Sequence, residues 1–168
     1  MLRIALVAGA AVLAASFSHP AAAQSAKALV GTWAPVSAVV TEASGAKTEV
    51  FGPRPTGMLI FTADGQYAVV VRRDELPKFA ANSRAKGTAE ENRAVVTGSI
   101  AHYGRYTVDP REGTVSFHIQ GSTYPNWDGM TQKRPFTVKG DQLTYKVPAP
   151  SVTAGSGELV WKRVKPQL

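Results

Sequence analysis

The chain has 168 residues, which suits one domain, and it contains no cysteine, so no disulfide can stabilise the fold. With 19 Lys and Arg residues against 12 Asp and Glu residues, the formal net charge is +7, which points to an anionic ligand or surface. The basic residues are dispersed apart from a short cluster at 162–165. No basic stripe is interleaved with aromatic residues, so nucleic acid is not an expected partner.

The N-terminal segment has the three-part layout of a secretory signal. Residues 1–3 carry a positive charge, residues 4–17 are almost uniformly apolar, and residues 21–23 are alanines that suit a signal peptidase. We therefore predict a signal peptide over residues 1–23 and a periplasmic or secreted protein. The alternative is a buried N-terminal helix. No later segment is apolar enough to cross a membrane, so no integral membrane segment is expected after signal cleavage.

Short runs of β-branched and aromatic residues, separated by turn signals, make up the rest of the chain and predict strands. Asp64-Gly65 is a strong hairpin signal, because glycine adopts the positive φ that a tight hairpin turn requires. Eight strands are expected, over residues 32–41, 57–62, 66–72, 102–109, 114–120, 131–138, 142–147 and 157–164.

One helix is expected between the third and fourth strands. Thr88 and Glu91 have the spacing of a capping box, in which each side chain satisfies a backbone N–H of the first turn. Val95, Val96 and Ile100 give the helix a modest apolar side. Its position suggests a lid or plug for whatever the strands enclose.

The eight strands are joined by local connections, which predicts sequential antiparallel pairing. Such a sheet has two exposed edges, and closing it into a cylinder removes both. We therefore predict an all-β domain over residues 24–168, folded as an eight-stranded antiparallel up-and-down barrel. A barrel of eight strands is either filled by side chains or holds one small ligand.

Five stretches carry a resemblance to a known family. They are the Gly-x-Trp pattern within 29–33, then 51–65, 103–106, 121–122 with 125–127, and 159–163. In this order they resemble the bacterial lipocalin-like domain family, over nearly the whole mature chain. The resemblance implies a lipocalin-type barrel but no particular chemistry. By analogy with relatives in biosynthetic settings, it suggests that the barrel acts on or carries a small hydrophobic molecule.

The resemblance also implies a structural pair at the closed end of the barrel. In lipocalins a tryptophan of the first strand is covered by an arginine that follows the last strand. Trp33 and Arg163 are the candidates here, with Lys162 as a competitor for the second role. A cation–π contact of this kind contributes about 0.5–2 kcal/mol, and we interpret the pair as structural rather than ligand-binding.

No residue pattern predicts a catalytic centre, a metal site or a cofactor. His102 and His118 lack a second histidine or an acid at ligand spacing. Ser156 lies between two glycines, but in a loop before a strand, whereas a nucleophile elbow joins a strand to a helix. The catalytic residues are therefore unknown, and neither a metal nor a cofactor is expected.

Four residues are candidates for contacting a ligand: Tyr106, His118, Trp127 and Arg134. An arginine inside an apolar barrel needs a partner, so an inward Arg134 would favour a ligand carboxylate or enolate. Alternation along a strand does not by itself say which face is inner. The alternatives are that His118 and Arg134 face solvent, and that Trp127 anchors a packed loop instead of lining the barrel mouth.

Three functions remain open from the sequence. The first is an exported barrel that binds a small hydrophobic or amphipathic molecule, including one that bears a carboxylate. The second is an isomerase or cyclase in which Tyr106, His118 and Arg134 converge to move protons and stabilise an anion. The third is a non-catalytic envelope protein with a filled barrel. A small hydrophobic ligand is the expected partner, and both a monomer and a homodimer remain open.

Overall fold

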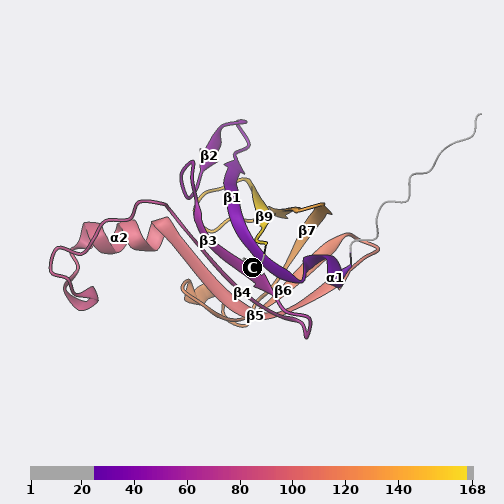
Figure 1. Cartoon of the computed structure of the whole chain (residues 1–168). Coiled ribbons are helices and arrows are strands. Elements are labelled where there is room, and N and C mark those ends of the chain that lie inside the picture. The colour runs from indigo at the N-terminus through magenta and orange to yellow at the C-terminus, as the bar shows by residue number, and fades with distance from the viewer. Residues whose placement is uncertain (1–24, 166–168) are drawn as a thin grey trace, which may run out of the picture.

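The computed structural model describes residues 25–165, which form one antiparallel sheet of nine strands (Figure 1). The predicted signal peptide and its cleavage site lie outside the described residues. The strands are β1 (Gly31–Thr41), β2 (Lys47–Glu49), β3 (Thr56–Phe61), β4 (Gln66–Arg72), β5 (Ser99–Asp109), β6 (Thr114–Ser122), β7 (Thr131–Lys139), β8 (Gln142–Val147) and β9 (Ser156–Arg163). The helices are α1 (Ala26–Leu29) and α2 (Ala89–Gly98), with short 3-10 turns η1 (Arg84–Lys86) and η2 (Pro125–Trp127).

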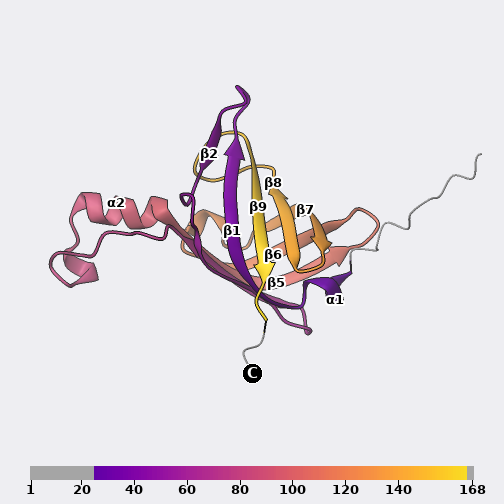
Figure 2. The ribbon, with the colours of Figure 1, turned by 45° about the horizontal axis from the view of Figure 1, so that its top comes forward.

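Eight of the nine strands close into a barrel, which confirms the predicted architecture. From β3 to β9 each strand pairs with the next, and β1 pairs with both β3 and β9. The closing ladder between β1 and β9 runs from Trp33 opposite Arg163 to Thr41 opposite Ser156. Figure 2 shows β1, β9, β8 and β7 side by side along one wall. The hairpin predicted at Asp64-Gly65 joins β3 to β4, with Gly65 at a φ of +84°.

The short strand β2 was not predicted. It pairs only with the second half of β1, where Val39 lies opposite Glu49, while the first half of β1 pairs with β3. All three residues of β2 are exposed, so no apolar alternation marks it in the sequence. The segment after β2 turns back toward the barrel interior, where Val50 and Phe51 are buried.

The helix α2 begins with the predicted capping box, in which Thr88 accepts from the Glu91 backbone N–H and Glu91 accepts from the Thr88 backbone N–H. It ends at Gly98, so Ile100 belongs to β5 and not to the helix. Figures 1 and 2 both show α2 extending away from the barrel, which corrects the expectation of a plug. The short helix α1 was also not predicted. Within residues 25–165, no helix is long and apolar enough to cross a membrane.

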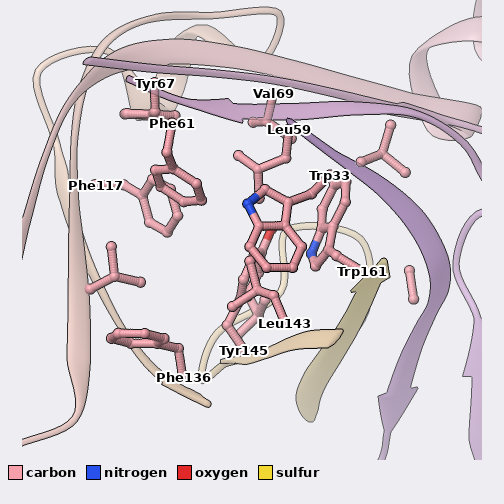
Figure 3. Packing of buried hydrophobic residues seen from close by; sticks show 14 of the residues in the cluster. Trp33, Leu59, Phe61, Tyr67, Val69, Phe117, Phe136, Leu143, Tyr145 and Trp161 are labelled. Atoms are coloured by element: carbon pink, nitrogen blue, oxygen red, sulfur yellow. The ribbon is translucent and has the colours of Figure 1, made fainter. Parts of the chain in front are cut away.

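Large apolar side chains fill one half of the barrel, which we call the closed half. The side chains of Trp33, Leu59, Phe61, Leu143 and Trp161 are at most 1% exposed and form one cluster (Figure 3). Packing at this density excludes water and supplies most of the hydrophobic stabilisation of a small domain.

A cap covers the end of the closed half. The Arg163 guanidinium lies 4.0 Å from the centre of the Trp33 ring and donates to the backbone carbonyls of Ala28 and Val30, each at 2.8 Å. The Trp33 indole N–H donates to the carbonyl of Leu29 at 2.8 Å. Arg163 therefore joins the last strand to α1 and the start of β1, and Lys162 is not the residue over the ring.

Candidate functional site

A cavity of about 420 Å³ occupies the other half of the barrel, which we call the open half. Its walls are mostly apolar, and its volume lies in the range of about 300–1,000 Å³ that is usual for small-molecule pockets. The wall residues include Val40, Val69, Val71, Ile100, Val147 and Leu159. The last turn of α2 and the loop before β9 border the mouth, where Val96 and Val152 are largely exposed.

Arg134 places a buried cation against this cavity. It alternates along β7 with outward Lys133 and Pro135, so its side chain points inward and is only 4% exposed. The guanidinium lies 5.3 Å from the centre of the Phe117 ring and 5.1 Å from that of Tyr145. An arginine stays protonated in proteins, so the positive charge persists although burial lowers the pKa of Arg134.

The Arg134 cation is incompletely satisfied by the protein. One terminal N–H donates to the side-chain oxygen of Gln132, whereas Nε has no partner among residues 25–165. No ion pair in this part of the chain joins Arg134 to a carboxylate. A buried charge without a counter-charge is costly, so the site is electrostatically prepared for an anion.

His102 and Tyr67 form a second polar unit beside the cavity. The Tyr67 hydroxyl and His102 Nδ1 are 2.9 Å apart, and the two residues are 3% and 6% exposed. Burial, helped by the Arg134 charge, lowers the pKa of His102 to about 3, and burial raises the pKa of Tyr67. Both groups are therefore uncharged at neutral pH, and Arg134 remains the cation of the site.

An aromatic frame holds these polar groups in place. The Phe117 ring contacts both the Arg134 guanidinium and the His102 ring, whose centre lies 6.0 Å from its own. The Trp127 ring, from η2, meets the His102 ring edge to face at 5.6 Å and also lines the cavity. Figure 3 shows Tyr67 and Phe117 close together, with Tyr145 farther along the barrel wall. A planar aromatic ligand would find matching ring surfaces here.

Two of the four predicted ligand contacts line the cavity, and two do not. Arg134 and Trp127 are among the lining residues. Tyr106 points inward but lies in the closed half, where its hydroxyl donates to the carbonyl of Thr62 at 2.9 Å and its ring packs 4.8 Å from that of Phe61.

His118 lies on the outer face of the barrel, which corrects the expectation that it reaches the interior. Its neighbours Phe117 and Ile119 are buried, so strand alternation turns His118 outward. There it bonds the hydroxyls of Thr107 and Thr131 on the adjacent strands, at 3.1 and 3.0 Å. The trio proposed for proton transfer, Tyr106, His118 and Arg134, therefore does not converge.

Sequence reasoning missed His102, Tyr67 and Tyr145 as site residues. The alternation of β8 places Tyr145 between buried Leu143 and Val147, and that of β4 places Tyr67 on the face of Val69. His102 shares the inner face of β5 with Tyr106. Strand alternation was thus the signal that could have found all three.

A second hollow, of about 530 Å³, lies on the outside of β3, β4, β5 and the end of β6, and His102 borders it as well as the interior cavity. It is lined by Met58, Val70 and Tyr103, which are 44%, 42% and 56% exposed. No buried cation borders this outer hollow, whereas Arg134 borders the interior cavity. The interior cavity is therefore the candidate site. Among residues 25–165, no cluster of three or more His, Asp or Glu side chains could hold a metal ion.

The protein is therefore a closed antiparallel β-barrel of eight strands with a cavity large enough for one small molecule. The chain belongs to the lipocalin-like domain family, whose model matches residues 30–164. It is 31% identical over 103 residues to the 4'-hydroxy-3'-methoxypropiophenone carrier protein ppsC of Aspergillus oryzae. The aligned region covers 56% of this chain and 93% of that protein. A solved structure of EF1p2_mFAP2b bound to DFHBI is similar over 84% of this chain and 98% of that chain, with 17% identity and a TM-score of 0.40.

Proposed function

We propose that this protein binds and carries a small amphipathic molecule in the open half of the barrel, with an apolar body against the walls and an acidic group beside Arg134. The observation that carries the proposal is a buried arginine with an unpartnered Nε and no carboxylate partner in residues 25–165, facing an apolar cavity. A ligand carboxylate or enolate would supply the negative charge that no carboxylate of residues 25–165 places beside Arg134.

The cavity supports a ligand with an aromatic body. Trp127 and Tyr145 line it, and each offers a ring face or edge to a bound ring. The related carrier from Aspergillus oryzae is named for 4'-hydroxy-3'-methoxypropiophenone, an aryl ketone with a phenol at the opposite end. A molecule of this kind combines an apolar ring with oxygen acceptors, as the cavity requires.

A direct binding assay tests the proposal. Purified protein is titrated with 4-methoxycinnamate and with 4'-hydroxy-3'-methoxypropiophenone, while tryptophan fluorescence and calorimetric heat are recorded. We expect saturable binding of one molecule per chain and a change in the emission of Trp127, because this indole lines the cavity. Trp127→Phe removes the expected fluorescence change but leaves the calorimetric signal. If neither compound produces a saturable signal, the proposal fails.

The role of the cation is tested by a matched pair of variants. Arg134→Met removes the buried charge, and Lys133→Met removes the same charge from the exposed neighbour that pairs with Glu112 on the outer face. Hydrogen bonds to a charged group contribute about 1.5–3 kcal/mol, so we expect Arg134→Met to weaken cinnamate binding by about 10- to 100-fold. Lys133→Met should change it by less than about twofold. Equal effects of the two variants would show that only the overall charge matters.

We further propose that the carrier works outside the cytoplasm, because residues 1–23 have the pattern of a secretory signal. Expression of the full chain in a Gram-negative host should yield a periplasmic or secreted product that begins at Gln24. Amino-terminal sequencing and cell fractionation measure this. A product that keeps Met1 and stays in the cytoplasm would contradict export without affecting the binding proposal.

A further inference from the structure

The groups beside the cavity differ in whether they can accept a hydrogen bond from a ligand. The Arg134 guanidinium has only donors, and its Nε–H is free of protein partners among the described residues. The Tyr145 hydroxyl can rotate and either donate or accept. A neutral imidazole has one donor and one acceptor nitrogen. The surroundings of His102 therefore determine which of its two nitrogens can donate to a ligand.

Tyr67 determines which nitrogen of His102 carries the proton. Within residues 25–165, the one hydrogen bond of the Tyr67 hydroxyl is to His102 Nδ1, and Tyr67 is not among the cavity-lining residues. If Nδ1–H were the donor, the phenolic proton would be buried without an acceptor, which proteins avoid. Tyr67 therefore donates to Nδ1, and the imidazole proton resides on Nε2.

The Nε2–H of His102 is left for a ligand. Nδ1 is engaged by Tyr67, and Nε2 has no hydrogen-bond partner among residues 25–165. Nε2 is also not fully buried, so a bound molecule can reach it. Because His102 lines the cavity and its Nδ1 is engaged by Tyr67, Nε2 is the nitrogen that it can offer to a bound molecule. Burial keeps the pKa of His102 low, so the ring remains neutral and the tautomer, not protonation, decides its role.

We infer that the Tyr67–His102 pair and Arg134 together form a donor-only recognition site, which selects a ligand head group that accepts hydrogen bonds and has none to donate, such as a carboxylate, an enolate or a ketone. The inference rests on the proposed function and narrows it to a substrate class. Phe117 contacts both His102 and Arg134 and so keeps the two donors on one aromatic support. An amide or an alcohol also accepts through its oxygen, but its N–H or O–H finds no acceptor on Arg134 or on His102 Nε2, and the cost of desolvating this donor weakens its binding.

The tautomer can be measured before any ligand is added. Long-range proton–nitrogen correlation spectra of the ¹⁵N-labelled wild-type protein report which nitrogen of each histidine bears the proton. We expect His102 to give the Nε2–H pattern, with His102→Gln identifying its signals. Tyr67→Phe removes the hydroxyl that holds Nδ1 as an acceptor, so a population with Nδ1–H should appear. A wild-type His102 with its proton on Nδ1 would overturn the inference.

Selectivity is tested with three probes that share one aromatic skeleton: 4-methoxycinnamate, the methyl ketone 4-methoxybenzylideneacetone, and 4-methoxycinnamamide. The ketone and the amide are both uncharged and nearly equal in shape, so they differ mainly in replacing a methyl group with a donor. We expect the wild-type protein to bind the ketone at least tenfold more tightly than the amide. His102→Gln should lose most of this preference, because a glutamine side chain can rotate to accept as well as donate.

The outcomes separate the inference from the proposed function. If cinnamate binds and the ratio of ketone to amide affinity is the same in wild type, Tyr67→Phe and His102→Gln, the donor-only inference is overturned while the carrier proposal stands. If none of the three probes binds, both fail. Thermal unfolding of each variant, recorded beside the affinities, identifies a variant that has lost its fold, and the wild-type spectrum and affinity ratio remain decisive in that case.

Discussion

The closed half and the open half of this barrel differ in what occupies the space between the strands. In the closed half, large side chains such as Trp33, Phe61 and Trp161 meet across the barrel and are almost completely buried. In the open half, smaller residues such as Val71 and Val147 line a cavity of about 420 Å³, beside the cation of Arg134. The same strands supply both halves. Side-chain size decreases from Trp33 to Ala38 and Val40 along β1, and from Trp161 to Leu159 and Gly157 along β9, and this change separates the packed core from the pocket.

This difference assigns stability and recognition to different residues. Close packing in one half stabilises the fold, whereas the unfilled volume and the uncompensated charge in the other half each reduce stability. Substitutions in the closed half should therefore lower stability without altering selectivity. Substitutions in the open half should alter selectivity with smaller effects on stability.

The largest effect should come from truncating the closed-half core. Trp161→Ala removes a side chain with no exposed surface, and such truncations cost about 3–5 kcal/mol in unfolding free energy. Urea denaturation measures the loss. Trp127→Ala, at the cavity mouth, should cost less than half as much because its indole is only partly buried. A loss at Trp161 no greater than that at Trp127 would show that the two halves contribute equally to stability.

The next effect is a dependence on pH that originates in the open half. His102 has a pKa of about 3 in the folded protein, whereas a free histidine titrates near 6.5. Below pH 6.5 His102 becomes protonated in the unfolded chain but stays neutral in the folded chain. The free energy of unfolding therefore decreases by up to about 1.4 kcal/mol per pH unit, until about pH 3. Above pH 6.5 both states are neutral and the contribution vanishes.

His102→Gln isolates this contribution, because glutamine can still accept from Tyr67 but does not titrate. We expect the wild-type protein to lose about 2.5 kcal/mol more than the variant between pH 6.5 and pH 4.5, measured by urea denaturation at each pH. All other titrating groups are shared by the two proteins and cancel in the comparison. Parallel stability curves would mean that His102 is as accessible to protons as an exposed histidine.

The sequence was sufficient to predict the barrel but not all of its parts. Alternating runs and hairpin turns such as Asp64-Gly65 are local signals, and they predicted the eight barrel strands and their sequential pairing. The strand β2 is held by its pairing with β1 and buries no side chain, so no alternation of apolar and polar residues in the sequence predicted it. The modest apolar side of α2 did not define which surface the helix would cover, and α2 extends away from the barrel.

Prediction of the site failed where strand faces were treated one at a time. Phe117 and Ile119 alternate with His118, so an inward apolar face requires His118 to be outward. Arg134 shares its face with Phe136, and the same logic turns it inward. Strand alternation does not specify the position of a side chain along the barrel axis. Tyr106 points inward as its strand pattern allows, yet the register of β5 on β4 and β6 places it in the closed half.

A third prediction compares two valines that differ mainly in their surroundings. Val115 is fully buried and does not border the cavity, whereas Val147 lines it. Both Val→Ala changes lose about 1.5 kcal/mol of transfer free energy, but only Val115→Ala opens a new void. We expect Val115→Ala to be more destabilising by about 1 kcal/mol in urea denaturation. Equal losses would indicate that the cavity closes up in the absence of ligand.

The smallest expected effect contrasts the inner and outer faces of the barrel. His118→Ala removes a ring whose two nitrogens bond Thr107 and Thr131 on the outer surface, where water replaces lost hydrogen bonds at little cost. Unfolding free energy should therefore change by less than about 0.5 kcal/mol, and affinity for 4-methoxycinnamate by less than twofold. His102→Gln, measured in parallel, should change the ketone-to-amide ratio at similar stability near neutral pH. A loss of ligand affinity at His118 would mean that recognition extends through the barrel wall, because His118 has no direct access to the cavity.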